Sequence, residues 1–306
     1  MENIRTILIA GASGFIGQAL THFLVEQGYE VKVLTRNSQS TIATFPEKAT
    51  ILLWPHVSEI KVNSVLYACD AVINLAGENI VALRWNKKNK KKLLESRTRS
   101  VEKLQQIISG LEQPPKAWIQ ASAIGYYGFN TQTPVDETAP KGSGFLAQVV
   151  DEWENTLTNC QISSTRKVFL RFGIVISPKG GFLWQMKKMA NRGLAICPGN
   201  GSQLMSWIHL EDLQWMVELV LNDETLQGPV NVVSPDTISI WGFTQLLKKH
   251  SRAWAALKMP SSIFRFIFGR EKTDEIFLAH QQVVPGVMEN HQFSFRYRSF
   301  EQVFKS

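Results

Sequence analysis

The sequence predicts an α/β fold in which a doubly wound parallel sheet is followed by a smaller C-terminal lobe. Between residues 5 and 176, apolar stretches of strand length alternate with stretches whose apolar residues recur at helical spacing. Such alternation indicates βαβ units, and continuously apolar strands indicate a sheet covered on both faces. After residue 177 the alternation weakens and glycine, proline and tryptophan become frequent, which favours a lobe over the carboxyl edge of the sheet. We therefore divide the chain into residues 1–176 and 177–306.

The individual elements follow from local composition. β-branched and apolar runs such as RTILIA (5–10) and YEVKVLT (29–35) are typical of strands, whereas residues 15–27 have apolar residues at helical spacing. By the same criteria we predict further strands at 50–54, 71–75, 117–121 and 166–176, and one at 228–234 that returns to the sheet. Further helices are predicted at 64–69, 96–109 and 145–158.

The composition argues against several classes of protein. With 44% hydrophobic and 19% charged residues among 306, the chain is ordinary for a globular protein. Cys69, Cys160 and Cys197 lie far apart, so we expect a reducing compartment, no disulfide scaffold and no metal site. The sequence has neither a run of about 18 apolar residues nor a signal-peptide pattern. We therefore predict a cytoplasmic protein without a membrane partner.

The basic residues point to no particular macromolecule. The net charge of +7 is compatible with an anionic ligand. We interpret the basic run 86–92 as the solvated face of a helix, because a nucleic-acid patch would interleave basic residues with aromatic ones. We expect a small-molecule substrate and no nucleic acid; the oligomeric state stays open, with a homodimer as one alternative.

A glycine-rich turn lies between the first predicted strand and the first predicted helix. It reads Gly11-Ala12-Ser13-Gly14-Phe15-Ile16-Gly17, with the G-x-x-G-x-x-G spacing of a dinucleotide-binding loop. Glycines allow a tight turn and close approach of the backbone to a pyrophosphate, while the helix N-terminus supplies N–H donors. A purely structural turn is the alternative, but the flanking strand and helix favour cofactor binding.

The end of the second predicted strand indicates which dinucleotide to expect. A site that prefers NAD usually has Asp or Glu there to bind the ribose 2′-OH, whereas this strand ends in Thr35 and Arg36. Arg36 is able to pair with a 2′-phosphate and to stack on adenine. We therefore predict NADP in preference to NAD; a surface arginine without a ligand is the alternative.

Motifs along nearly the whole chain resemble those of one protein family. They include GASGFIG (11–17), NLAGENI (74–80), SAIGYYG (122–128), RFGIVIS (171–177), SWIHLED (206–212) and NVVSP (231–235). In these the sequence resembles the extended short-chain dehydrogenase/reductases, and more closely their atypical "epimerase family" branch. The resemblance implies a Rossmann-like sheet, NADP binding and a C-terminal substrate lobe.

The same resemblance assigns cofactor contacts to single residues. It places Thr35 and Arg36 at the adenosine 2′ position and Val175 on the nicotinamide side. It also implies contacts on the adenine–ribose side and from the following helix, by Leu75, Ala76, Gly77 and Arg97. For Arg97 an ordinary salt bridge on a helix surface is the alternative.

The stretch SAIGYYG supplies the candidate catalytic groups Ser122, Tyr126 and Tyr127. In active members of the superfamily a serine polarises the substrate oxygen, and a tyrosine transfers its proton with help from a lysine four residues later. That Tyr-x-x-x-Lys pair would fall near 145–150, where this chain has neither residue. A free tyrosine has a pKa of about 10, so using it as a base at pH 7 costs about 4 kcal/mol. A role in catalysis, in ligand orientation or in packing therefore stays open for these residues.

Further candidates lie on the expected substrate side. Arg84 and Trp85 follow the fourth predicted strand, and Gln203, Trp207 and His209 belong to the segment that leads into the lobe. His209 is either an acid/base group or a structural histidine. The sequence thus predicts an NADP(H)-binding oxidoreductase or sugar-epimerase-like enzyme acting on a small carbonyl or alcohol. The alternative is a non-catalytic NADP-binding regulatory protein.

Overall fold

Seven parallel strands form the central sheet, in the order β11-β6-β5-β4-β1-β2-β3. The structure, a computed structural model, describes residues 4–36, 44–54, 67–162 and 164–304. The strands are β1 (Thr6–Ala10), β2 (Glu30–Thr35), β3 (Thr50–Leu53), β4 (Ala71–Asn74), β5 (Ala117–Ala123), β6 (Arg166–Phe172) and β11 (Gly228–Val232). This is the Rossmann order, extended by β11, so the predicted fold class is confirmed. Of the short helix predicted at 64–69, residues 64–66 lie outside the described residues.

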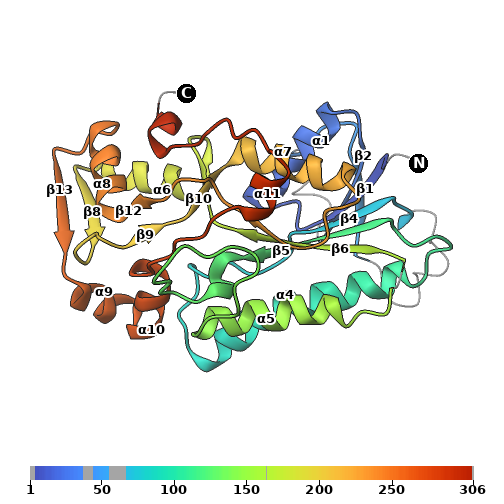
Figure 1. Ribbon diagram of the computed structural model, residues 1–306, viewed down its shortest axis with the longest axis horizontal. Coiled ribbons are helices and arrows are strands. Elements are labelled where there is room, and N and C mark those ends of the chain that lie inside the picture. The colour runs from blue at the N-terminus through green and yellow to red at the C-terminus, as the bar shows by residue number, and fades with distance from the viewer. Residues whose placement is uncertain (1–3, 37–43, 55–66, 163, 305–306) are drawn as a thin grey trace.

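Helices cover both faces of the sheet (Figure 1). α1 (Phe15–Glu26) and α7 (Leu210–Asn222) pack on one face, and α4 (Lys87–Ile108) and α5 (Phe145–Thr158) pack on the other. Successive side chains of β1 point to opposite faces: Ile7 and Ile9 join the first core, while Leu8 joins the second. The continuously apolar strands of the sequence are thus explained by burial on two sides.

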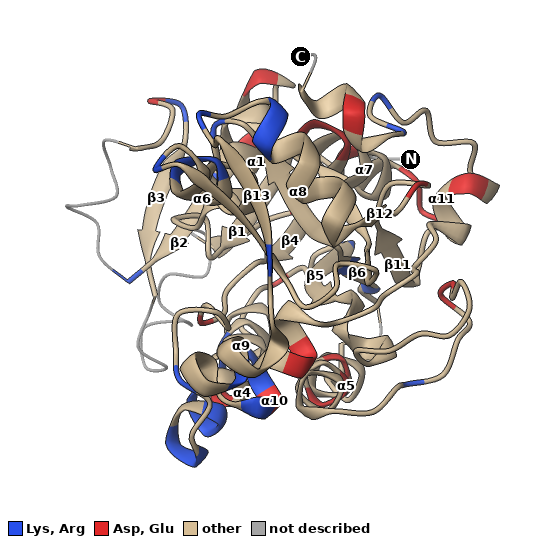
Figure 2. Cartoon of the chain, turned by 90° about the vertical axis from the view of Figure 1, so that its left-hand side faces the viewer, with Lys and Arg blue, Asp and Glu red and all other residues tan. Residues whose placement is uncertain are grey.

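Helix α4 begins nine residues before its predicted start at residue 96, because the basic run forms its first turns. The Asn86 side chain accepts a hydrogen bond from the backbone N–H of Asn89 and caps the helix. Most of its lysines are exposed to solvent, as predicted for a solvated helix face, and basic residues gather around this end of α4 (Figure 2). Lys90 pairs with Glu271 of α10 (Arg270–Lys272), which joins α4 to the C-terminal part of the chain.

The single strand predicted at 166–176 is wrong, since the chain forms two strands interrupted at Gly173. β6 stays in the main sheet, whereas β7 (Ile174–Ser177) pairs with β10 (Trp207–His209). A Cβ at Gly173 would lie 2.8 Å from the Val233 side chain and 2.9 Å from the Ser206 carbonyl oxygen. Glycine is therefore required where the chain leaves the main sheet. The pairing of β7 with β10 brings residues 204–206 to the edge of that sheet.

The remaining elements form a smaller lobe with a core of its own. They are α6 (Gly181–Ala190), β8 (Leu194–Pro198), β9 (Leu204–Met205), β12 (Ile238–Ser239), α8 (Ile240–Lys249), β13 (Ala255–Met259), α9 (Ser261–Phe268), α10, the π-helical turn η3 (Thr273–Phe277) and η4 (Phe300–Phe304). α7, β11 and α11 (Gly286–Asn290) lie beyond residue 176 but pack with the main sheet. Within the described residues, no helix combines the length and apolarity that crossing a membrane requires.

Candidate functional site

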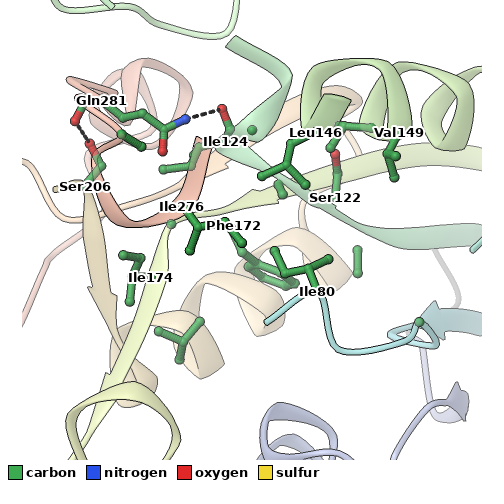
Figure 3. A pocket seen from close by; sticks show the side chains of 18 of the residues that line it. Ile80, Ser122, Ile124, Leu146, Val149, Phe172, Ile174, Ser206, Ile276 and Gln281 are labelled. Carbon is green, nitrogen blue, oxygen red and sulfur yellow. Dashed lines mark hydrogen bonds between the residues drawn. The ribbon is translucent and has the colours of Figure 1, made fainter. Parts of the chain in front are cut away.

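A cavity of about 500 Å³, here called the central pocket, opens at the carboxyl ends of the sheet strands. Its wall includes Gly11 after β1, Leu75 after β4, Ser122 in β5 and Phe172 at the end of β6. The lobe closes the pocket from the other side with Ile174, Ser206, Ile276 and Gln281 (Figure 3). Ligands of open α/β sheets bind at this edge.

The predicted glycine turn forms one end of the central pocket. A Cβ at Gly11 would lie 2.6 Å from the Ala76 nitrogen, and one at Gly17 would lie 2.5 Å from the Ala12 Cα, so both positions exclude a side chain. A Cβ at Gly14 would meet only the Gly11 oxygen, at 3.5 Å. Gly14 also begins α1 without a side-chain cap, which leaves the first N–H groups of the helix for a ligand.

Arg97 reaches the central pocket from α4. Its guanidinium donates to the backbone oxygens of Leu93 and Glu78 and lies over the ring of Trp153, 5.1 Å from the ring centroid. Burial lowers its pKa to about 10, partly offset by Glu78, so it remains charged at pH 7. Among the described residues it forms no ion pair, because the carboxylate of Glu78 pairs with Lys92. The surface salt bridge that was the alternative for Arg97 is thus not found among the residues that the structure describes.

Thr35 and Arg36 end the second strand outside the central pocket. Thr35 is buried in β2, and Arg36 follows it with an exposed side chain. No ion pair of Arg36 is found within the described ranges, which stop at residue 36 and resume at 44. The guanidinium is therefore accessible at the sheet edge where the adenosine end of a dinucleotide would lie.

Ser122 belongs to a buried polar cluster that also contains Glu154 and Arg171. The Ser122 hydroxyl donates to Glu154 Oε1 at 2.5 Å, and Figure 3 shows it directed toward α5, the helix that carries Glu154. Arg171 donates from Nε to Oε1 at 2.9 Å and from Nη2 to Oε2 at 2.8 Å. Ser122 and Arg171 are register neighbours on β5 and β6, which places both side chains on the face covered by α5. Burial opposes the charge of Arg171, but Glu154 raises its pKa above the ordinary value.

Tyr127 is part of the same cluster but does not line the central pocket. Its hydroxyl accepts from Arg171 Nη1 and donates to Asn231 Oδ1, both at 2.8 Å. Burial raises the pKa of Tyr127 to about 12 in spite of the adjacent Arg171. Next to this tyrosine, Arg171 is therefore a cation that the sequence could not locate. Its charge lowers the pKa of Tyr127 by less than burial raises it. Tyr127 is therefore neutral at pH 7.

The wall contributed by α5 is apolar where the superfamily's tyrosine and lysine would fall. Leu146, Val149, Val150 and Trp153 line the central pocket at helical spacing. Tyr126 does not line it; its ring stacks under Arg171, with the guanidinium carbon 3.6 Å from the ring centroid. Of the three candidate catalytic residues, only Ser122 meets the pocket.

The five residues predicted on the substrate side do not line the central pocket. Arg84 is exposed, and Trp85 packs on Phe145 while its indole N–H donates to the Ile80 oxygen. Gln203 donates to the Pro198 oxygen and borders a separate polar cavity, and Trp207 is fully buried.

His209 has the structural role that was one of its two predicted alternatives. Its Nδ1 accepts from the backbone N–H of Glu211 and caps α7, and its ring packs on Tyr297. Burial, together with Arg296, lowers the pKa of His209 to about 4. The neighbouring Asp212 accepts from the backbone N–H groups of Arg296 and Tyr297, which ties the C-terminal segment to α7.

The C-terminal segment supplies polar residues that sequence reasoning missed. Glu275 accepts from the backbone N–H groups of Phe145 and Leu146 and caps α5. Gln281 donates to the backbone oxygens of Ile124 and Gly128, and Ser206 donates to the Gln281 oxygen. The side chains of Glu275 and Gln281 contact residues more than 120 positions earlier in the chain, so no local sequence pattern could indicate these contacts.

The predicted cofactor residues divide into two sets. Those that line the central pocket are Gly11, Gly14, Phe15, Ile16, Gly17, Leu75, Gly77, Arg97 and Val175. Those outside its lining are Ser13, Thr35, Arg36 and Ala76. Ser13 is exposed in the glycine turn, and Ala76 lies directly against Gly11. In the described part of the chain, no group of three or more His, Cys, Asp or Glu side chains is arranged to hold a metal ion.

Comparisons with known proteins agree with this geometry. The sequence pattern of the NAD dependent epimerase/dehydratase family matches residues 7–233. An epimerase family protein of Mycobacterium bovis is 35% identical over 96% of this chain and 94% of its own length, and the human epimerase family protein SDR39U1 is 32% identical over 94% and 95%. The crystal structure of human SDR39U1 (isoform 2) with NADPH superposes with a TM-score of 0.86 at 29% identity, covering 98% of both chains. UDP-glucose 4-epimerase of Thermotoga maritima, solved with UDP-glucose, shares the fold at 18% identity, with a TM-score of 0.78 over 98% of this chain and 96% of its own.

Proposed function

Because the chain belongs to the NAD-dependent epimerase/dehydratase family, we propose that it is an oxidoreductase that uses NADP(H) to interconvert a small carbonyl compound and its alcohol. The observation that carries this proposal is a hydroxyl–carboxylate pair: Ser122 lines a pocket that also contains a dinucleotide cradle, and its hydroxyl donates to the buried Glu154 carboxylate behind it.

The residues present fit NADP(H). Gly11 and Gly17 permit the close turn, Gly14 leaves room for a pyrophosphate, and Arg97 supplies a charged group at the pocket wall. The exposed Arg36 is suited to a 2′-phosphate, and no acidic residue ends β2 to bind a ribose 2′-OH. When bound, the cofactor supplies or accepts the hydride.

Ser122 and Glu154 supply a route for the proton. Because the Ser122 hydroxyl donates to Glu154, the lone pairs of its oxygen remain for a hydrogen bond from a substrate hydroxyl. In alcohol oxidation the substrate proton passes to Ser122 Oγ while the serine proton passes to Glu154; carbonyl reduction uses the reverse order. The pair thus takes the place of the missing tyrosine and lysine, and Arg171 holds the Glu154 carboxylate in position.

The test compares Ser122→Ala with Gly11→Ala. Ser122→Ala interrupts the proton route but leaves the Glu154–Arg171 ion pair intact, so we expect NADPH affinity within threefold of wild type and turnover reduced about 10²–10⁴-fold. Gly11→Ala places a methyl group against Ala76 and abolishes NADPH binding. NADPH binding is followed by fluorescence titration, and turnover by loss of NADPH absorbance over a panel of aldehydes and ketones. Wild-type turnover that Ser122→Ala leaves unchanged would refute the proton route.

The non-catalytic alternative is favoured by one observation, the apolar α5 face where the catalytic dyad of the superfamily would lie. If the protein is a regulatory NADP(H)-binding protein, we expect tight NADPH binding and no turnover of any carbonyl compound in the same assay. Failure to bind either NADPH or NADH would refute both alternatives.

A further inference from the structure

The polar groups of the central pocket are few. Among its described lining residues, the polar side chains are Arg97, Ser122, Ser206, Glu275 and Gln281, together with the indole of Trp153. Apart from the glycine turn, the other lining side chains are apolar and include Leu146, Val149, Phe172, Ile174 and Ile276, which Figure 3 labels. Leu204, Met205 and Ala279 also belong to this set. We call this part the apolar end of the pocket.

Most of these polar groups are already used within the protein. The Ser206 hydroxyl donates to the Gln281 backbone oxygen and accepts from the Val283 N–H. The Gln281 amide N–H₂ donates to two backbone oxygens, and Glu275 caps α5 with both carboxylate oxygens. The hydroxyl proton of Ser122 is directed to Glu154. At the apolar end, the serine lone pairs and the Gln281 amide oxygen remain available, and both are acceptors.

The remaining donors lie on α4 and on α5, where Trp153 follows Val149 by about one helical turn. Arg97 uses only part of its guanidinium for Leu93 and Glu78, and the buried Trp153 indole N–H has no acceptor among the described residues. The Arg97 guanidinium lies over the Trp153 ring and against Gly77, which belongs to the predicted cofactor contacts. We therefore assign these donors to the cofactor.

A sugar would be poorly matched at the apolar end. Each buried hydroxyl without a partner weakens binding about 5- to 150-fold, and a hexose ring carries several. A nucleoside diphosphate would also need cations, yet Arg97 is the one Lys or Arg among the described lining residues. The separate cavity lined by Asn130, Gln203 and His280 has no Lys or Arg in its described lining either.

We propose that the apolar end binds a small alcohol with an aliphatic or aromatic skeleton, and not a nucleotide sugar. This inference rests on the proposed function. The alcohol donates a hydrogen bond to Ser122 Oγ. On oxidation its carbon gives a hydride to NADP⁺, its hydroxyl proton passes to Ser122 Oγ and the serine proton passes to the Glu154 carboxylate, which yields the aldehyde or ketone and NADPH. The skeleton contacts the apolar residues of α5, β7 and the C-terminal segment, and the cavity of about 500 Å³, which the cofactor shares, limits its size.

The test measures ligand binding separately from turnover. Full-length protein loaded with NADPH, with which an alcohol does not react, is titrated calorimetrically with benzyl alcohol, cyclohexanol and 2-heptanol, and in parallel with UDP-glucose and glucose. We expect the apolar alcohols to bind at least about tenfold more tightly than either sugar. Tighter binding of UDP-glucose or glucose, or binding of none of these ligands by protein that binds NADPH, would overturn the inference. Failure to bind NADPH would instead refute the proposed function.

A matched pair of variants locates the binding. Val149→Thr keeps the side-chain shape but adds a hydroxyl to the apolar end, and we expect it to weaken binding of the apolar alcohols about 3- to 30-fold with unchanged NADPH affinity. Val81→Thr makes the same substitution at an exposed valine outside the lining and should leave both affinities unchanged. Equal effects of the two substitutions would contradict the location.

Discussion

Replacement of Tyr127 by phenylalanine tests whether this tyrosine stabilises the fold or takes part in the reaction. The hydroxyl is buried, accepts from Arg171 and donates to Asn231 Oδ1. Its removal leaves the fully buried amide oxygen of Asn231 and one Arg171 N–H without a partner. A buried group that loses its partner costs about 1–3 kcal/mol, so we expect Tyr127→Phe to lower the free energy of unfolding by about 2–4 kcal/mol.

The same residue predicts a distinct pH dependence. The pKa of Tyr127 is about 12 in the folded protein and 10.0 when unperturbed, so between these values the unfolded chain binds fewer protons than the folded one. The free energy of unfolding therefore falls as the pH rises from 10 to 12, by about 3 kcal/mol in total. This loss should be absent from Tyr127→Phe.

The measurement is urea unfolding at pH 7 and at intervals up to pH 12. Tyr126→Phe is the matched control, because the Tyr126 hydroxyl has no hydrogen bond among the described residues and its removal should cost less than about 0.5 kcal/mol. Turnover of any substrate found should stay within threefold of wild type in both variants. A Tyr127→Phe protein that is fully stable, or one that binds NADPH normally but loses turnover more than 100-fold, would refute the structural role.

Two further predictions concern the cofactor and the lobe. Arg36→Leu should weaken NADPH binding about 10- to 100-fold and leave NADH binding within threefold, since only NADPH carries the 2′-phosphate; equal effects on both dinucleotides would argue against the assignment. The pKa of His209 is lowered from 6.5 to about 4, so between these pH values the unfolded chain binds more protons than the folded one. The free energy of unfolding therefore decreases by about 3 kcal/mol as the pH falls from 6.5 to 4. His209→Asn, which keeps a side chain able to cap α7, should lose less stability between pH 6.5 and 4 in thermal or urea unfolding, and an unchanged pH profile would contradict the burial argument.

Some errors of the sequence-based predictions share a physical cause. The strand predicted at 166–176 breaks at Gly173 because Val233 and Ser206 approach it closely, and neither contact is local in sequence. Trp207 was expected to meet substrate, but β10 carries it into the core of the lobe.

Local sequence determined the sheet, the helices that cover it and the glycine cradle. Strand and helix periodicity, and the spacing of Gly11, Gly14 and Gly17, depend on residues close together in the chain. The sequence also located Ser122 at the end of a strand and established that the Tyr-x-x-x-Lys pair is absent.

Only the tertiary structure decided which groups accompany Ser122. Glu154 lies 32 residues from Ser122 and Arg171 lies 17 residues beyond Glu154, and strand register and helix packing bring the three together. The same packing buries the Tyr127 hydroxyl and raises its pKa to about 12 although Arg171 donates to it. Burial and long-range register are properties of the whole fold, so no local pattern could show that the serine, and not the tyrosines beside it, faces the pocket.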